Sequence, residues 1–287
     1  MKYYLSAILG MLMWASSFIA TKIAYQSFSP LLLCLVRFAI ASVLMICIRL
    51  FQKQKIHIRK KDRKNVILSA LAGISVYYAF ENIALKYTSA SAASLIEAAY
   101  PAITILIGVL IYHERSSKRM LAGIIISILG VVIITDFSDM ASNGMLGNLL
   151  LILDGFLWGF YNFLVQGIPD EYDTFTLSYY QFLYGTLFFI PMLFLEHPSM
   201  THLNPSVIIA VLYLSAGCSV LAFILYNYGL KGIPASSASA IMNLMPVFGI
   251  ILSVLILHET VTVRQILGGI VIMSGVLIST SQQASKQ

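Results

Sequence analysis

The sequence has 287 residues, of which 59% are hydrophobic and only 10% charged, and its formal net charge is +6. Soluble domains are about 25% charged, so this composition excludes a soluble globular protein and predicts a polytopic membrane protein. Lys and Arg gather in loops between apolar runs. The positive charge therefore indicates membrane topology, and we expect no nucleic-acid partner.

Neither a cofactor nor a metal site is expected. Cys34, Cys47 and Cys218 all fall in apolar runs without paired spacing, which argues against disulfides and zinc. His113 and His258 have no partners at metal-ligand or catalytic-triad spacing. No Gly-rich Walker loop occurs in the sequence, so ATP is not expected to be the direct energy source.

Hydropathy predicts ten membrane-spanning helices, because about 20 apolar residues at 1.5 Å rise cross the hydrocarbon. The first has a basic residue before its apolar run, as a signal peptide has, but it lacks a cleavage site and we expect it to be retained. Long apolar runs favour helices over barrel strands, so we expect an all-α integral membrane fold. The predicted spans are 4–24, 30–50, 66–86, 91–112, 119–135, 146–167, 174–195, 206–228, 234–257 and 264–281.

The basic loops predict the orientation, because Lys and Arg favour cytoplasmic loops. With both basic loops inside and an even number of spans, both termini are expected in the cytoplasm. We expect a multi-pass protein of a bacterial inner (plasma) membrane, in the lipid bilayer as a monomer or weak dimer. The basic residues after the second span are Arg49, Lys53, Lys55, Arg59, Lys60, Lys61, Arg63 and Lys64, and those after the fourth are Arg115, Lys118 and Arg119.

An internal repeat divides the chain into residues 1–140 and 141–287. At a constant offset of 145, the stretch from Ser89 to Glu114 matches Pro234 to Glu259, with Pro101 opposite Pro246. Roughly twenty identities fall between residues 82 and 135 without a gap, too many for shared hydrophobicity alone. Because each half has five spans, the second half must enter the membrane inverted. Inverted repeats recur in secondary transporters, with the substrate near the midplane.

One motif of this repeat carries a family resemblance. Glu, eight residues, Gly, six residues and Gly-Val occur as Glu114, Gly123, Gly130 and Val131, and again as Glu259, Gly268, Gly275 and Val276. With the duplicated prolines and five-plus-five topology, the chain resembles the EamA family of the drug/metabolite transporter superfamily. The resemblance implies a transporter with a central cavity between two five-helix halves, often for metabolite or amino-acid efflux. It does not imply one substrate.

The family motif also has a structural interpretation. The glycines form strips of small residues that allow helices to pack closely. Glu114 and Glu259 follow apolar runs and are expected to accept backbone amides or to pair with Arg119 and Arg264.

Asp154 is the deepest charge, about ten residues into the sixth span. The same helical face carries Trp158, Asn162 and Gln166, which follow Asp154 at intervals of four residues, and Tyr161 lies beside this face. An acid inside a membrane costs about 2.5 to 3.5 kcal/mol at the centre, so it is a functional candidate by default. The functional interpretation is a cavity lined by this face; the alternative is a protonated Asp154 that hydrogen-bonds a neighbouring helix.

Glu97 lies four residues before Pro101, which removes the backbone hydrogen bond to the carbonyl of Glu97. A free carbonyl and a carboxylate in one turn are suited to a proton, a cation or a substrate ammonium. In the second half the equivalents are Met242 and the turn before Pro246, followed by Asn243. The alternative is that both prolines only kink their helices for packing.

Arg37, Glu81 and Glu97 share a predicted depth of roughly 8 to 10 Å below the outer surface. An Arg–Glu pair would hold an outer gate closed, and Arg37 would equally suit a substrate carboxylate. Snorkelling of Arg37 to the interface is the alternative.

We therefore expect a secondary transporter, not an enzyme, that exports a small amphipathic metabolite such as an amino acid or organic amine by alternating access, with proton coupling. An ion channel or an intramembrane enzyme is the alternative. Aromatic side chains with buried acids suit an amine through cation–π contacts. The expected substrate-binding residues are Trp14, Tyr78, Glu97, Tyr100, Asp154, Trp158, Tyr161, Asn162, Tyr180 and Asn243; those for coupling or gating are Glu97, Asp154, Arg37, Glu81, Pro101 and Pro246.

Overall fold

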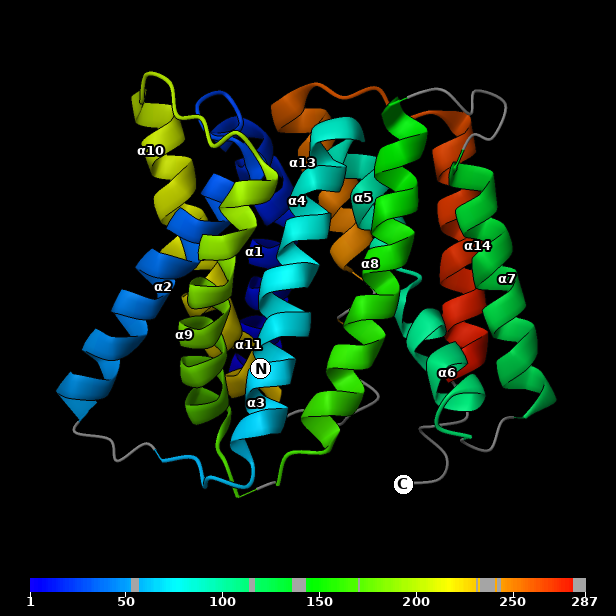
Figure 1. Cartoon of the computed structure of the whole chain (residues 1–287). Coiled ribbons are helices and arrows are strands. Elements are labelled where there is room, and N and C mark those ends of the chain that lie inside the picture. Colours follow the sequence, from blue (N-terminus) through cyan, green and yellow to red (C-terminus); the bar gives the residue numbers. More distant parts are fainter. Residues whose placement is uncertain are drawn as a thin grey trace.

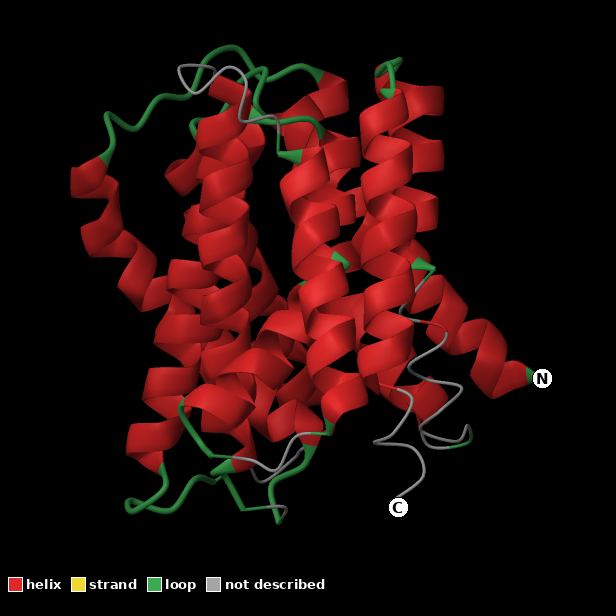
Figure 2. Ribbon diagram, turned by 90° about the vertical axis from the view of Figure 1, so that its right-hand side faces the viewer, coloured by secondary structure: helices red, strands yellow, loops and turns green. Residues whose placement is uncertain are grey.

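The computed structural model describes residues 1–52, 57–113, 117–135, 143–169, 171–230, 232, 241 and 244–280. Their regular structure is helical, apart from one isolated bridge between Phe28 and Met200 (Figure 2). The predicted all-α fold is therefore confirmed.

The first half of the chain folds into helices whose bounds lie close to those predicted from hydropathy (Figure 1). The third predicted span contains a short π-helix, η1, and the fourth is interrupted. The elements are α1 (Lys2–Ala24), α2 (Pro30–Gln52), α3 (Arg63–Ala70), η1 (Leu71–Val76), α4 (Tyr77–Tyr87), α5 (Ala90–Glu97), α6 (Tyr100–Leu110) and α7 (Lys118–Ile134).

The second half also contains a π-helix, η3, in the middle of its third long helical stretch. Residues 233–240 and 242–243, where the ninth predicted span begins, lie outside the described residues. The elements are α8 (Asn143–Gln166), α9 (Thr174–Met192), η2 (Leu193–Leu195), α10 (Pro205–Leu212), η3 (Tyr213–Leu221), α11 (Ala222–Leu230), α13 (Met245–Leu257) and α14 (Val263–Thr280).

Within the described ranges, 7 helical stretches are long and apolar enough to cross a membrane. Helices α13 and α14 are shorter apolar helices. The prediction of ten spans therefore stays a prediction. The long stretches are Lys2–Ala24, Pro30–Phe51, Arg63–Tyr87, Ala90–Leu110, Gly144–Gln166, Thr174–Leu195 and Pro205–Tyr226.

Apolar side chains cover the outside of the bundle. On α7 the exposed face is formed by Leu121, Ile125, Ile128, Leu129 and Val132, each between 39% and 58% exposed. A soluble monomer rarely exposes so large a continuous apolar surface. This surface is the one expected of a helix that faces lipid.

Pro101 accounts for the interruption between α5 and α6. It occupies the first turn of α6, where its missing N–H costs nothing, and its ring cannot follow a continuous helix through Glu97. Ala98 and Ala99 form the turn between the two helices. In the second half, Pro246 lies at the same place in the first turn of α13.

Helices α7 and α14 run antiparallel and pack through glycines (Figure 1). A Cβ built on Gly123 would lie 2.6 Å from the carbonyl oxygen of Gly275, and one on Gly130 would lie 2.7 Å from that of Gly268. Between these contacts Ser127 Oγ donates to the Ile272 carbonyl at 3.3 Å. The predicted role of the glycine strips in close packing is confirmed.

The two halves contact each other through matching pairs of helices. Helix α1 packs against α11 as α8 packs against α4, and α2 packs against α9. At one end, the loop after α1 meets the loop before α10, where Thr201 N donates to the Ser27 carbonyl at 2.9 Å. At the other, the loop before α3 meets the loop after α8, where Arg59 pairs with Glu171 at 2.6 Å.

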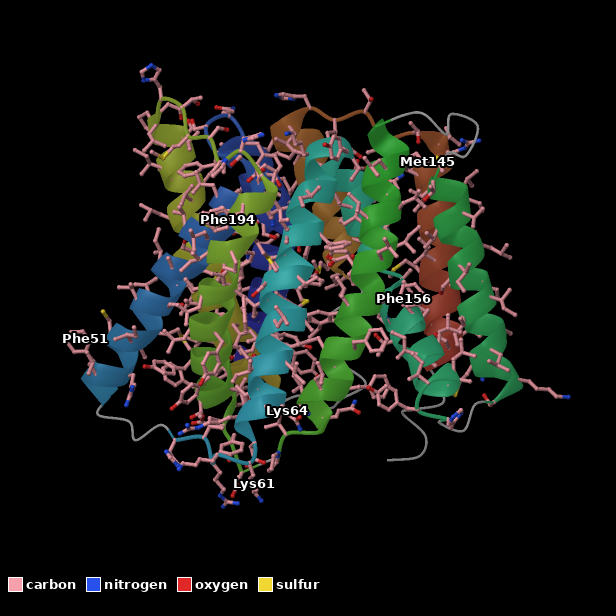
Figure 3. The ribbon with its side chains drawn as sticks, viewed as in Figure 1. Phe51, Lys61, Lys64, Met145, Phe156 and Phe194 are labelled. Carbon is pink, nitrogen blue, oxygen red and sulfur yellow. The ribbon has the colours of Figure 1, made fainter. Side chains whose placement is uncertain are left out.

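The charged loop before α3 lies at one end of the bundle. Figure 3 shows Lys61 and Lys64 at this end and Met145 near the opposite end. The N-terminal end of α1 and the C-terminal end of α14 are directed toward the end that carries these lysines (Figures 1 and 3).

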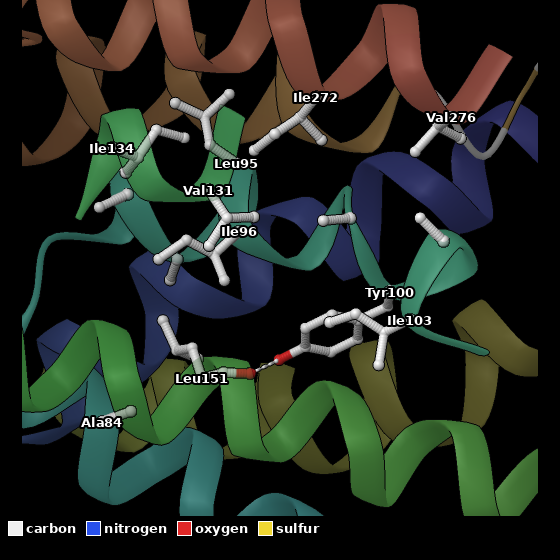
Figure 4. Close-up of a cluster of buried hydrophobic side chains, with 14 of the residues drawn as sticks. Ala84, Leu95, Ile96, Tyr100, Ile103, Val131, Ile134, Leu151, Ile272 and Val276 are labelled. Atoms are coloured by element: carbon white, nitrogen blue, oxygen red, sulfur yellow. Dashed lines mark hydrogen bonds between the residues drawn. The ribbon is translucent and has the colours of Figure 1, made fainter. Parts of the chain in front are cut away.

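The largest buried cluster surrounds α5 and α6 and includes side chains from α4, α7, α8 and α14. Within it Tyr100 OH donates to the Leu151 carbonyl at 3.0 Å (Figure 4). The interrupted helix is therefore held by packing from both halves of the chain.

Candidate functional site

A cavity of about 200 Å³ lies between helices of the two halves. The elements α1, α2, η1, α4, α5 and α6 line it from the first half, and α8, α9, η3, α11 and α13 from the second. Ten of the residues singled out in the sequence line this cavity: Trp14, Arg37, Tyr78, Glu81, Glu97, Tyr100, Pro101, Trp158, Tyr161 and Pro246.

Two carboxylates belong to the cavity lining. Glu81 on α4 is 4% exposed, and Glu97 is the last residue of α5. The Oε1 atom of each is buried and has no hydrogen-bond partner among the described residues. A buried polar atom without a partner carries a desolvation cost of about 1–3 kcal/mol, so both groups are poised to accept a donor.

Arg37 provides the positive charge of the same cavity. Its side chain is buried, its Nε donates to Ser219 Oγ at 2.9 Å, and its guanidinium lies 4.7 Å from the ring centroid of Tyr78. Its Nη1 has no partner in the described part of the chain. Arg37 forms no ion pair with Glu81 or Glu97 in this conformation, and its burial contradicts snorkelling to the interface.

Aromatic rings form much of the wall. Trp14 Nε1 donates to the Cys218 carbonyl at 3.0 Å, which fixes the indole of α1 against the second half. Trp158 on α8 lies between Tyr77 and Tyr161, with ring centroids 5.4 and 5.3 Å away. The two tryptophans therefore line one cavity from opposite halves of the chain.

Asp154 lies behind the cavity wall, so the expectation that it lines the cavity is wrong for this conformation. It is fully buried, and its Oδ2 accepts a hydrogen bond from Tyr100 OH at 3.3 Å, whereas its Oδ1 has no partner within the described ranges. The ring of Tyr100 belongs to the cavity lining. Trp158, one turn further along the same face of α8, lines the cavity, whereas Tyr100 of α6 lies against Asp154.

Two other predicted binding residues, Asn162 and Tyr180, are described by the structure but do not line the cavity. Asn162 Nδ2 donates to the Trp158 carbonyl one turn earlier at 2.8 Å. Tyr180 packs against Tyr179 and Tyr184, with ring centroids 5.3 and 6.0 Å away. Asn243 lies outside the described residues.

The sequence did not point to several cavity residues. Tyr77 directly precedes Tyr78, one of the predicted cavity residues, so its position carried only a weak signal. Ser219 bonds Arg37 across 182 positions of sequence, and nothing in the local sequence indicates that pairing. Within the described residues no group of three or more His, Cys, Asp or Glu gathers as a metal site would require.

The fold and this cavity define a polytopic membrane protein with an internal polar site between apolar helices. The chain belongs to the EamA-like transporter family, whose model matches residues 1–136 and 145–281. The predicted resemblance to this family is confirmed, and the protein is a multi-pass membrane transporter. The family assignment points to transport rather than catalysis.

Relatives and a solved structure agree with this assignment. An uncharacterized transporter of Archaeoglobus fulgidus is 32% identical over 286 residues, covering 98% of this chain and 98% of the relative. The uncharacterized transporter YcxC of Bacillus subtilis is 27% identical over 284 residues, covering 96% of this chain and 91% of the relative. A protein of known crystal structure has the same fold, with a TM-score of 0.66 at 20% identity, over 99% of this chain and 98% of that chain.

Proposed function

We propose that this protein is a secondary transporter that exports a small amphipathic solute carrying an ammonium group. It works by alternating access between two inverted five-helix halves, residues 1–140 and 141–287. The observation that carries the proposal is the pair of carboxylates, Glu81 and Glu97, in the lining of an aromatic cavity, each with an unpartnered buried oxygen.

The contact between α7 and α14 supports an inverted repeat. At the offset of 145, Gly123 is equivalent to Gly268 and Gly130 to Gly275. Gly123 meets Gly275 and Gly130 meets Gly268, so each residue contacts the equivalent of the other. Equivalent antiparallel helices that cross in this way are related by an axis perpendicular to them. Such an axis lies in the membrane plane and inverts one half relative to the other.

The cavity chemistry supports an ammonium-bearing solute. Carboxylate oxygens without partners attract a cation, and the rings of Trp14, Trp158 and Tyr78 offer cation–π contacts as well as apolar area. A volume of about 200 Å³ lies below the roughly 300 to 1,000 Å³ of pockets for drug-sized ligands. A small metabolite therefore suits the site better than a large drug.

The proposed topology has ten spans in a bacterial inner membrane, with the end that carries Lys61 and Lys64 in the cytoplasm. The positive-inside rule supports this orientation. The directions of α1 and α14 support placing both termini on that side.

Proton coupling is proposed to occur at Glu97. A carboxylate that binds the solute ammonium cannot hold a proton at the same time, so the two cations compete for one group. When the solute leaves on the outer side, a proton takes its place and returns inward. This competition makes export an exchange of solute for a proton.

The test is uptake of L-leucine and isopentylamine into proteoliposomes with an acidic interior, with protein-free liposomes correcting for passive amine entry. The gradient should stimulate transport of at least one solute by the wild-type protein. Glu97→Gln should abolish that stimulation.

The control is Glu171→Gln, because Glu171 lies in a surface loop and pairs with Arg59 away from the cavity. This variant should keep the stimulation by the gradient. Uptake that ignores the gradient in the wild-type protein, or equal stimulation in Glu97→Gln, would contradict coupling at Glu97.

A further inference from the structure

We infer that the two π-helices, η1 and η3, are paired hinges, and that a tryptophan of the opposite half holds one of them at a time by a hydrogen bond. In this conformation Trp14 holds η3, and in the opposite conformation Trp158 holds η1. The inference rests on the alternating access of the proposed function, and it adds where the helices bend and which bonds hold each bend.

The two π-helices occupy equivalent places in the two halves. Each follows an α-helix of 8 residues, α3 or α10, and each continues into a further α-helix, α4 or α11. Each also packs against the first two long helices of the other half: η1 against α8 and α9, and η3 against α1 and α2. π-Helices often lie at functional sites, and a bend at either of these moves one half against the other.

The two π-helices also share a serine that bonds across the wider turn. In this region the offset between the halves is 144, as it is for the two tryptophans, and it pairs Ser75 with Ser219. Ser219 Oγ donates to the Leu214 carbonyl at 3.0 Å. Ser75 Oγ lies 3.5 Å from the Ala70 carbonyl. Each carbonyl belongs to the residue five positions earlier, which is the spacing that the backbone of a π-helix bonds.

Trp14 ties η3 to α1 in this conformation. Trp14 Nε1 donates to the Cys218 carbonyl at 3.0 Å, and Cys218 Sγ donates to the Met13 carbonyl at 3.1 Å. Trp158 is the equivalent of Trp14, and Ile74 of η1 is the equivalent of Cys218. Trp158 and Ile74 both line the cavity, but the indole N–H of Trp158 forms no hydrogen bond among the described residues and its ring packs on tyrosines.

A second pair of equivalent donors shows the same asymmetry. Arg37 on α2 and Gln181 on α9 are also related by the offset of 144. Arg37 Nε donates to Ser219 Oγ of η3 at 2.9 Å. Gln181 Nε2 donates to Ser69 Oγ of α3 at 3.0 Å, and not to Ser75 of η1. Two donors of the first half therefore hold η3, whereas neither equivalent donor of the second half holds η1 within the described ranges.

This asymmetry indicates what the opposite conformation contains. Two equivalent halves related by an axis in the membrane plane exchange their arrangements when access changes side. The bonds to η3 then break, and the equivalent bonds to η1 form, with Trp158 Nε1 donating to the Ile74 carbonyl. Because one set of bonds replaces the other, the two conformations stay close in free energy, as an alternating carrier requires.

The experiment measures hydrogen–deuterium exchange of the purified full-length protein in lipid nanodiscs, without solute, over residues 71–76 and 213–221. Trp14→Phe removes the donor to η3 and keeps an aromatic ring. It should speed exchange in η3 and slow exchange in η1, changing the ratio of the two rates about fivefold, the factor that one hydrogen bond of ordinary net strength contributes. Trp158→Phe should change the ratio in the opposite direction.

Tyr226→Phe is the matched control, because the Tyr226 ring lies 5.2 Å from that of Trp14 but does not line the cavity. It should leave both exchange rates unchanged. Ser219→Ala keeps both tryptophans and removes the hydroxyl that bonds across η3. It should shift the ratio in the same direction as Trp14→Phe, which tests the inference if the tryptophan variants fail to fold.

The response of the distant π-helix distinguishes a hinge from a structural contact. If Trp14→Phe speeds exchange in η3 and leaves η1 unchanged, or if both tryptophan variants shift the ratio in the same direction, the paired hinges are wrong and the proposed transporter is unaffected. Reciprocal shifts in a protein that shows no saturable counterflow of L-leucine or isopentylamine would support the hinges and contradict the solute class of the proposed function.

Discussion

Tyr100 belongs both to the cavity lining and to the largest buried hydrophobic cluster. Its ring lines the cavity, and its hydroxyl reaches the Leu151 carbonyl and Asp154 Oδ2, at 3.0 and 3.3 Å. Figure 4 shows the first of these contacts inside the apolar cluster. Tyr100 thus separates the cavity from a fully buried acid that has no other described hydrogen-bond partner.

Tyr100→Phe should lower the free energy of unfolding by about 1–3 kcal/mol, because it leaves a buried carboxyl group without a donor. Thermal unfolding in detergent measures this change. The control Tyr112→Phe removes a hydroxyl from a half-exposed ring that stacks on Phe163, so its melting temperature should stay near that of the wild type. Equal melting temperatures for the two variants would show that the Tyr100 hydroxyl contributes nothing.

For single residues, the sequence predicts the type and depth of the side chains at the candidate site better than the direction in which each side chain points. Depth along a helix follows from counting residues, and it places Arg37, Glu81 and Glu97 at one level; all three belong to the cavity lining. Which side chain covers Asp154 depends on packing with a distant helix, and Tyr100 of α6 lies against it. The contact between Arg37 and Ser219 joins residues 182 positions apart, which no local pattern reveals.

Among the described elements, α7 and α14 make the most extensive helix contact. A Cβ on Gly123 would lie 2.5 Å from the backbone nitrogen of Ser279 and 2.6 Å from the Gly275 oxygen. Backbone atoms cannot yield as the end of a flexible side chain does, so the two helices would have to separate.

Gly123→Ala should therefore destabilise the protein by about 1–3 kcal/mol, as overpacking of a tight contact does. Gly144→Ala in α8 is the matched control, because its nearest neighbour would be the Tyr87 oxygen at 4.0 Å. That substitution should be neutral or stabilise by up to about 1 kcal/mol through helix propensity. Thermal unfolding of both variants in one detergent makes the comparison, and similar melting temperatures would refute the close contact.

Helix bounds were predictable to within a few residues, because apolar runs, prolines and basic loops all mark the ends. Pro101 indicated that the fourth span is interrupted, and the structure separates α5 and α6 at Ala98 and Ala99. No comparable feature of the sequence marks the π-helices η1 and η3. A wider helical turn is a response to packing, and hydropathy does not report it.

At the scale of the whole molecule, the two halves are tied together at the end opposite Lys61. Glu259, which begins the loop between α13 and α14, accepts hydrogen bonds from the backbone amides of Ala90 and Ser91 at 2.9 and 3.0 Å. It thereby caps α5, the helix that carries Glu97. The prediction that Glu259 accepts amides is confirmed, whereas Glu114 lies outside the described residues.

Glu259→Gln should destabilise the protein by about 0.5–2 kcal/mol, because a charged cap at a helix N-terminus is replaced by a neutral one. Glu171→Gln breaks an exposed ion pair with Arg59 at the other end and should cost at most about 1 kcal/mol. Chemical unfolding in a common detergent compares them. A larger loss for Glu171→Gln would mean that the cap does not hold the halves together.

The central claim is that the cavity between the halves is the solute site of a carrier. Counterflow of labelled L-leucine or isopentylamine into proteoliposomes preloaded with the same solute tests it most directly. We predict saturable counterflow for the wild type, its loss in Ala98→Trp, which fills the cavity from the turn between α5 and α6, and its retention in Ala122→Trp on the exposed face of α7. Undiminished counterflow in a folded Ala98→Trp variant, or unsaturable conductance through the wild-type protein, would contradict the claim.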